Sequence, residues 1–434
     1  MVSFKLSDDF LLGTATASVQ IEGGDTKNTW YKWSQEGHIT DNSSPITACD
    51  HWNRVEEDTG LLKELNVQTH RMSLEWSRIE PEAGRFSKAA IKHYRSELQL
   101  LAENRIKPLV TLHHFSEPQW FQDMGGWLKP ENSDLFAEYV KFAVENLGDL
   151  VSEWVTFNEP NVYTSFGYEI GIFPPGLKDL FESNKVRAEL IKTHVRIYDL
   201  IHSIRKEKNF PGKTMVGAAI HIRVFDGITF AGRRLAAVAD YYFNELFMSG
   251  MTEGKIKLPL IKNGYKHKKG LYVDFLGINY YTRNIVEFAW DPKLYFHKYV
   301  NDMGLEKSDL GWDIYPEGLL RVCRKYYKRY RLPIYITENG ISDRFDNRRP
   351  DFIVNHLARI AKAIKEGIEV KRYYYWTLMD NFEWLEGETT NFGLYDCDFS
   401  TQKRTPRGSA ALYAQICKEK GYKNRYDQIE NVIE

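Results

Sequence analysis

The chain has 434 residues, of which 43% are hydrophobic and 27% are charged, and its formal net charge is −1. A chain of this length can bury a large core without disulfides or a structural metal, and its length fits one α/β barrel enlarged by insertions. The near-zero net charge gives no electrostatic basis for binding nucleic acid or an anionic membrane surface. A neutral small molecule remains open as a substrate.

The cysteines indicate a reducing environment. Cys49, Cys323, Cys397 and Cys417 are widely scattered and form no CxxC pair, which disfavours both a disulfide framework and a zinc site. The first residues carry one lysine and two aspartates before any apolar run, unlike a signal peptide, and no stretch has the roughly 18 apolar residues of a transmembrane helix. We therefore expect a cytoplasmic protein with no membrane partner, no metal and no cofactor.

Short apolar or aromatic runs alternate along the chain with longer stretches of helical spacing. Eight runs are predicted as strands: 10–17, 69–76, 108–113, 153–157, 215–222, 273–280, 334–337 and 372–378. The helical stretches are 52–65, 91–104, 135–147, 186–206, 316–330 and 352–366. Several strand runs are apolar throughout, which is typical of parallel strands covered by helices.

Eight strand-then-helix units predict one domain, residues 1–434, folded as a single (β/α)8 TIM barrel with elaborated loops at the C-terminal face. A doubly wound open sheet is the alternative fold. No GxGxxG or P-loop pattern follows a predicted strand, so the nucleotide-binding form of that alternative is disfavoured. In a barrel, reactive residues should gather at the C-terminal ends of the strands.

Polar and aromatic side chains do follow most of the predicted strands. In chain order they are Gln20, Glu22, Arg71, Glu75, His113, His114, Asn158, Glu159, Asn279, Tyr281, Glu338, Trp376, Asp380, Asn381, Glu383 and Trp384. Carboxylates, amides and imidazoles match vicinal hydroxyl pairs, and aromatic faces stack on the C–H groups of a sugar. The aromatic content alone fits a sugar-binding surface and a well-filled core equally.

Glu159 and Glu338 are the two carboxylates that we predict to react. Glycoside hydrolysis needs one carboxylic acid to protonate the leaving oxygen, and in the retaining mechanism a second carboxylate attacks the anomeric carbon. The ends of the fourth and seventh strands lie on different sides of the barrel mouth, so these side chains can converge. We expect Arg71 and Tyr281 to support a negative Glu338, and that charge to raise the pKa of Glu159.

The motifs around these residues resemble those of a known family. The sequences TFNEP at 156–160 and YITENG at 335–340 are similar to the motifs of family 1 glycoside hydrolases. The resemblance extends over nearly the whole chain through FLLGTATASVQIEG at 10–23, RMSLEWSR at 71–78, DFLGINYYT at 274–282 and WTLMDNFEW at 376–384. The His-His-Phe sequence at 113–115 is similar to that of archaeal-like β-glycosidases.

The resemblance implies a barrel that hydrolyses terminal β-D-glucosides, and also β-galactosides or β-fucosides, through a covalent glycosyl-enzyme. It implies that Glu159 is the acid/base and Glu338 the nucleophile. The implied substrate-binding residues are Gln20, His113, Asn158, Tyr281, Trp376, Glu383 and Trp384, and the implied supporting residues are Arg71 and Asn279. Small-molecule β-glycosides or oligosaccharides are the expected partners.

Three positions depart from the family pattern. A tryptophan is more usual at His114, which predicts a changed shape of the glycone site. An aromatic residue is more usual at Glu388 and a basic residue at Asn391, which predicts an unusual substrate preference near the sugar 6-position. The segment 241–273 is shorter than in many members, which predicts a wider or more apolar entrance suited to aryl or alkyl aglycones. The 6-phosphoglycosidase branch is disfavoured, because Glu383 and Glu388 would repel a dianion.

Three alternatives to simple hydrolysis differ in the residues that they need. A transglycosylating enzyme would use the same residues. A non-catalytic carbohydrate-binding barrel would lose a catalytic carboxylate, whereas this chain has both glutamates. A TIM-barrel isomerase or aldolase would need a metal cluster, a Schiff-base lysine at a strand end or a phosphate-binding glycine loop, and the sequence shows none of these.

Overall fold

The protein is described by a computed structural model that covers residues 3–260, 265, 268–291, 297–300 and 303–423. Eight parallel strands form a closed barrel in the order β11-β12-β2-β3-β4-β5-β6-β8. They are β2 (Leu11–Ala15), β3 (Thr69–Ser73), β4 (Lys107–His113), β5 (Glu153–Asn158), β6 (Met215–His221), β8 (Leu276–Asn279), β11 (Ile334–Asn339) and β12 (Val370–Trp376). Each of the eight predicted runs overlaps one of these strands, so the predicted barrel is confirmed and the open sheet is wrong.

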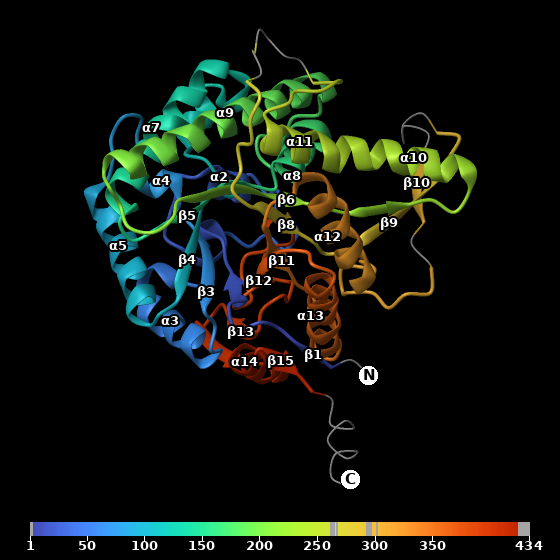
Figure 1. The fold of residues 1–434 in the computed structure, drawn as a ribbon. Coiled ribbons are helices and arrows are strands. Elements are labelled where there is room, and N and C mark those ends of the chain that lie inside the picture. Colours follow the sequence, from blue (N-terminus) through green and yellow to red (C-terminus); the bar gives the residue numbers. More distant parts are fainter. Residues whose placement is uncertain (1–2, 261–264, 266–267, 292–296, 301–302, 424–434) are drawn as a thin grey trace.

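Helices surround the barrel, as Figure 1 shows. The predicted helical stretches correspond to α3 (Val55–Glu64), α5 (Lys88–Glu103), α7 (Ser133–Leu147), α9 (Leu180–Glu207), α12 (Pro316–Tyr330) and α13 (Arg349–Lys365). Short polar side chains cap two of them: Ser87 accepts a hydrogen bond from the backbone N–H of Ala90, and Asp179 accepts two at the start of α9. Such caps satisfy N–H groups that have no partner within the helix.

The barrel strands are enclosed on both sides. Every residue of β3, β5, β6, β8 and β11 is buried. Burial on both faces explains why β6 and β8 are mostly apolar and show no alternation of polar and apolar residues. Charges inside the barrel are paired: Arg372 donates to Glu153 at 2.6 Å, with both side chains buried. A buried charge without a partner would be strongly destabilising.

Several elements that the sequence analysis did not predict lie outside the barrel. The chain between β6 and β8 forms α10 (Phe230–Asp240), the π-helical turn η5 (Tyr241–Glu245) and α11 (Leu246–Glu253). A small sheet in the order β10-β9-β7, formed by His297–Val300, Arg283–Phe288 and Val224–Asp226, packs against α10. Together with α10 it projects from the barrel as a lobe (Figure 1).

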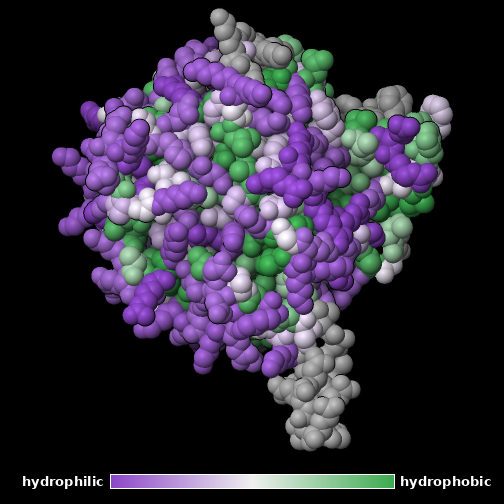
Figure 2. Space-filling view, viewed as in Figure 1, coloured by the Kyte–Doolittle hydropathy of each residue, from purple (hydrophilic) through white to green (hydrophobic). Residues whose placement is uncertain are grey.

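The visible surface of the molecule is mostly hydrophilic, and hydrophobic side chains gather over the projecting lobe (Figure 2). The two ends of the described chain meet where β1 (Phe4–Lys5) pairs with β15 (Gly421–Tyr422) in an antiparallel ladder. The four cysteines all lie in the described ranges and are buried free thiols. No helix in these ranges is long and apolar enough to cross a membrane.

Candidate active site

A cavity of about 430 Å³ opens where the barrel strands end, and its size suits a small-molecule ligand. Its lining combines carboxylates with aromatic side chains. The lining residues are His114, Phe115, Asn158, Glu159, Val162, Phe166, Ile172, Phe173, His221, Arg223, Tyr281, Leu310, Trp312, Glu338, Trp376, Glu383, Trp384, Leu385, Glu386 and Phe392. The two predicted reactive glutamates therefore share one cavity.

Glu159 follows β5 and forms the N-cap of the short helix α8 (Pro160–Thr164). Its backbone is in the left-handed region, with φ 41° and ψ 55°, which is uncommon for a non-glycine residue and is disfavoured further before a proline. Its N–H donates to the carbonyl of Ala219 on β6 at 2.7 Å. A strained conformation persists only where the surroundings hold it, and such sites are often functional.

Glu338 lies near the end of β11 and accepts two hydrogen bonds from buried donors. Nη1 of Arg71 donates to its Oε1 at 2.6 Å, and the hydroxyl of Tyr281 donates to its Oε2 at 2.7 Å. Nη2 of Arg71 donates to Oδ1 of Asn158 at 2.7 Å, and its Nε donates to Thr111 at 3.0 Å. Arg71 thus connects three strands below the cavity and supports Glu338, as expected.

A second support, Asn279, ends β8 and connects the two glutamates to one network. Its Nδ2 donates to Oε1 of Glu159 at 2.8 Å and to Oδ1 of Asn158 at 3.0 Å. The hydroxyl of Thr337 donates to Oδ1 of Asn279 at 2.6 Å, which fixes the orientation of the amide. Because Asn158 also accepts from Arg71, one continuous network of hydrogen bonds runs from Glu159 to Glu338.

The pKa values of the two glutamates move in opposite directions. Burial raises the pKa of Glu338 to about 7, against the charge of Arg71 and with a further contribution from the charge of Glu159. Burial also acts to raise the pKa of Glu159, but its electrostatic interaction and hydrogen bond with His221, together with the hydrogen bond of Asn279, bring it below its ordinary value. The expectation of a raised pKa for Glu159 is therefore wrong, because it did not include these donors.

His221 and Arg223 belong to the cavity wall and were missed in the sequence. Nδ1 of His221 lies 3.0 Å from Oε1 of Glu159, and Nε of Arg223 donates to Nε2 of His221 at 3.1 Å. His221 ends β6, so its position at the C-terminal end of the fifth predicted strand was the signal that could have identified it. Arg223 lies beyond the strand, where no such signal existed.

The structure corrects the assignment of His113 as a sugar-binding residue. Its ring packs against Trp127 and Phe157 outside the cavity lining, and its Nε2 pairs with Glu117 at 2.6 Å. His114 instead lines the cavity, where its Nε2 lies 2.8 Å from Nδ2 of Asn158. Successive side chains of an extended chain point to opposite sides, so only one of two adjacent histidines can face the cavity.

Two further residues lie behind the cavity wall. Gln20 is completely buried and donates to Oε2 of Glu383 at 3.1 Å, so it contacts the cavity through Glu383. Burial, together with the charge of Glu338, raises the pKa of Glu383 to about 8. Glu75 belongs to a separate buried cluster with Ser18, outside the cavity lining.

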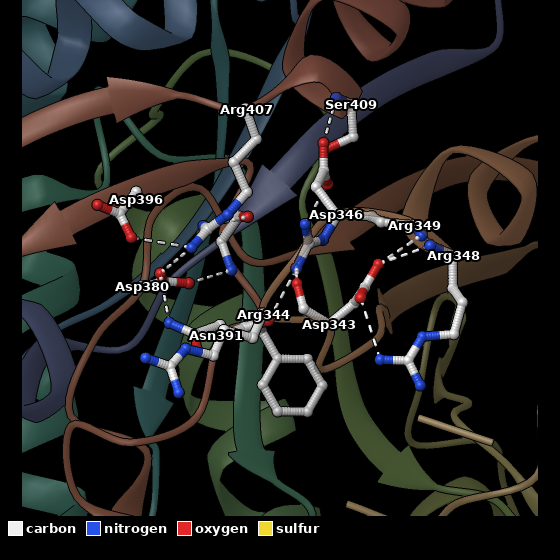
Figure 3. A network of polar contacts seen from close by, with 12 residues as sticks. Asp343, Arg344, Asp346, Arg348, Arg349, Asp380, Asn391, Asp396, Arg407 and Ser409 are labelled. Carbon is white, nitrogen blue, oxygen red and sulfur yellow. Dashed lines mark hydrogen bonds and ion pairs between the residues drawn. The ribbon is translucent and has the colours of Figure 1, made fainter. Parts of the chain in front are cut away.

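The loop after β12, which carries Glu383 and Trp384, is anchored by the polar network in Figure 3. Asp380 accepts from Arg407 at 2.6 Å, from Asn391 at 2.9 Å and from the backbone N–H of Gly393 at 2.8 Å. The amide of Asn391 is therefore bound to Asp380 and does not line the cavity. Asn391 therefore contributes no side chain to the cavity lining, and an unusual substrate preference near the sugar 6-position stays a prediction.

Comparisons with known proteins agree with this arrangement. A sequence model of the family described as Glycosyl hydrolase family 1 matches residues 2–422. The chain is 33% identical to beta-glucosidase A of Thermotoga maritima, over 96% of this chain and 98% of that protein. Among the described part of the chain, no group of three or more His, Cys, Asp or Glu side chains is arranged to hold a metal ion.

Two solved structures are similar along their whole length. The beta-glycosidase from Pyrococcus horikoshii matches with a TM-score of 0.90 and 37% identity, covering 98% of this chain and 97% of that one. The beta-glucosidase from Thermotoga maritima in complex with deoxynojirimycin matches with a TM-score of 0.88 and 31% identity, covering 97% of this chain and 100% of that one. The likeness therefore extends over nearly the whole chain.

Proposed function

Because the chain belongs to glycosyl hydrolase family 1, we propose that it is a β-glucosidase that also accepts β-galactosides and β-fucosides. Its substrates would be small-molecule β-glycosides or oligosaccharides with a terminal non-reducing β-D-glycosyl residue. The observation that carries the proposal is the pair of glutamates in one cavity, each with its own donors. Arg71 and Tyr281 hold Glu338, while His221 and Asn279 hold Glu159.

Retention in this family requires two displacements at the anomeric carbon. In the first, a carboxylate oxygen of Glu338 bonds to the anomeric carbon as the bond to the aglycone oxygen breaks, and Glu159 gives its proton to that oxygen. In the second, Glu159 takes a proton from water as the water oxygen attacks, and Glu338 is released as a carboxylate. Support for this assignment comes from the two donors on Glu338, because both favour its ionised form.

One proton shared between the carboxyl groups of Glu159 and Glu338 is enough for the first displacement. The raised pKa of Glu338 and the lowered pKa of Glu159 both favour that proton on Glu338. The reactive form has the same number of protons but holds the proton on Glu159, so only its location differs. A bound glycoside favours the transfer, because its glycosidic oxygen accepts a hydrogen bond from protonated Glu159 and the sugar contacts Glu338.

The sugar would occupy the part of the cavity formed by the loops after β4, β5 and β12. Trp376 supplies an aromatic face for its C–H groups, and Asn158, Glu383 and Trp384 supply polar atoms for its hydroxyls. His114 takes the place that the sequence analysis gave to His113. Gln20 acts by orienting the carboxyl of Glu383.

The aglycone would lie against an apolar wall. Val162, Phe166, Ile172, Leu310 and Trp312 line the cavity without contributing a charge. An apolar wall favours aryl or alkyl aglycones over a second sugar. Activity on 4-nitrophenyl β-glucoside should therefore exceed activity on cellobiose, and equal activity on both would contradict this part of the proposal.

The deciding experiment is labelling with 2-deoxy-2-fluoro-β-glucosyl fluoride, followed by peptide mass mapping. The fluorine slows release of the glycosyl-enzyme, so an adduct should accumulate on the peptide that contains Glu338. The matched control is Glu338→Gln, which should take no label while remaining folded. A folded wild-type protein that takes no label and leaves aryl β-glucosides and β-galactosides intact would indicate a carbohydrate-binding barrel instead.

A further inference from the structure

Arg223 is the only lysine or arginine among the described residues that line the cavity. Its side chain follows that of His221 by two residues, so the two point to the same side of the extended chain. His221 in turn contacts Glu159, the proposed acid that protonates the leaving oxygen. Arg223 therefore lies on the aglycone side of the cavity.

The side chain of Arg223 lacks the ion pair that three other enclosed arginines of this protein form. Arg71 pairs with Glu338 at 2.6 Å, Arg187 with Glu169 at 2.7 Å and Arg404 with Asp58 at 2.9 Å. Within the described ranges Arg223 makes no such pair, and its Nη1 and Nη2 donate no hydrogen bond. A half-buried cation without a carboxylate is costly unless a ligand supplies the charge.

The surrounding residues hold Arg223 in one place. The side chain of Asn244 accepts from its backbone N–H at 3.2 Å and donates to its carbonyl at 2.8 Å. Its Nε is bound to His221, and its guanidinium lies over the ring of Phe243 at 5.2 Å. Phe243 and Asn244 both come from the π-helical turn η5, an irregularity that is frequent at functional sites. Nη1 and Nη2 are the nitrogens of the Arg223 guanidinium that remain for a ligand.

We propose that Arg223 binds a carboxylate on the aglycone, so that β-glycosides of aglycones with an acidic group are a preferred substrate class. This inference rests on the proposed function. The planar fork of a guanidinium suits a carboxylate, which it can bind through two parallel hydrogen bonds. On the sugar side of the cavity, Glu159, Glu338 and Glu383 would repel an anion, so the acidic group has to be on the leaving group. The imidazole of His221 separates Glu159 from Arg223. The carboxylate of the aglycone would therefore lie about the length of one aromatic ring from the glycosidic oxygen.

The test compares two substrates that differ only in charge. They are the phenolic O-β-glucoside of 3-(4-hydroxyphenyl)propanoic acid and that of its primary amide. Two methylene groups separate the carboxylate from the phenol, so both leaving groups have nearly the same acidity. The ratio of kcat/KM for the acid to kcat/KM for the amide is measured at low salt for the wild type, Arg223→Gln and Arg223→Lys. Any loss that comes from disturbing His221 and Glu159 affects both substrates and cancels in the ratio.

We expect a wild-type ratio of about 10 or more, equivalent to about 1.4 kcal/mol, and a ratio at or below 1 for Arg223→Gln. Arg223→Lys keeps the charge but not the fork and should lie between the two. Arg321→Gln is the matched control, because Arg321 pairs with Asp226 outside the cavity lining and its loss should leave the ratio unchanged. Added salt should lower the wild-type ratio.

A wild-type ratio at or below 1, or a ratio that is the same in Arg223→Gln, would overturn the inference. If Arg223→Gln does not fold, Arg223→Lys and the salt dependence of the wild-type ratio test the same contact. Failure of the proposed function gives a different result, since the wild type would then hydrolyse neither substrate nor 4-nitrophenyl β-glucoside.

Discussion

Arg223 fixes the tautomer of His221. The Nε–H group of Arg223 donates to Nε2 of His221 at 3.1 Å, and a guanidinium has no acceptor atom with which to reverse that bond. Nε2 therefore carries no proton, and the proton of the neutral imidazole is on Nδ1. Since Nδ1 lies 3.0 Å from Oε1 of Glu159, the imidazole donates to this carboxyl group.

The first prediction concerns the pH dependence of kcat/KM. One proton shared by Glu159 and Glu338 is required, so activity should fall as pH rises through the pKa of Glu338 at about 7. On the acid side, activity should fall as the pair of carboxyl groups takes up its second proton, on Glu159, at a pH below the ordinary pKa of a glutamate. In His221→Phe the donor to Glu159 is lost, which raises the pKa of Glu159 and should move the acid limb to higher pH.

The measurement is kcat/KM for 4-nitrophenyl β-glucoside between pH 4 and pH 10. His221→Gln is the control, because it keeps an N–H donor and should shift the acid limb less than His221→Phe does. An acid limb at the same pH in all three proteins would show that His221 does not position the proton of Glu159.

The second prediction tests the proposed proton donor. In Glu159→Ala, kcat/KM should fall by about 10²–10⁴-fold for a glucoside of a weakly acidic phenol, which needs a proton to leave. For 2,4-dinitrophenyl β-glucoside the loss in kcat/KM should be much smaller, because this phenolate leaves without protonation. Equal losses for the two substrates would argue against Glu159 as the acid. A Glu338 variant, which lacks the nucleophile, should lose activity on both.

The third prediction concerns Tyr281, whose hydroxyl donates to Oε2 of Glu338 at 2.7 Å. Tyr281→Phe keeps the ring and removes this bond to a charged group, which is worth about 1.5–3 kcal/mol. We expect kcat/KM to fall by about 10- to 100-fold. Loss of the donor also raises the pKa of Glu338, so the alkaline limb should move to higher pH. A lower kcat/KM with an unmoved alkaline limb would indicate that the hydroxyl contacts the substrate only.

The fourth prediction concerns stability. Burial, together with the charge of Asp25, raises the pKa of Glu75 to about 8. Between pH 4.5 and 8 the folded protein therefore keeps a proton that the unfolded chain loses, and the free energy of unfolding decreases as pH rises. Glu75→Gln has no such proton. Its free energy of unfolding relative to that of the wild type should therefore increase by on the order of a few kcal/mol between pH 5 and pH 8. Urea unfolding at both pH values measures the difference, and an equal difference at both would contradict the raised pKa.

The sequence alone located the barrel and the two glutamates. Strands buried on both faces are rich in apolar and aromatic residues, so the eight runs were visible without any knowledge of their partners. The carboxyl ends of parallel strands meet on one face of a barrel, so Glu159 and Glu338 could be placed in one site from their strand positions and their motifs.

What the tertiary structure decided was the orientation of side chains beyond the strand ends. The alternation of a strand ceases where the chain turns, as at Phe115 with φ 65° and Glu159 with φ 41°, and the choice between His113 and His114 depended on that turn. The pKa of Glu159 likewise depended on His221, which is 62 residues distant in the chain. Local sequence patterns indicate which elements form, because they reflect the burial of each element. Contacts between distant loops follow only from the closure of the barrel.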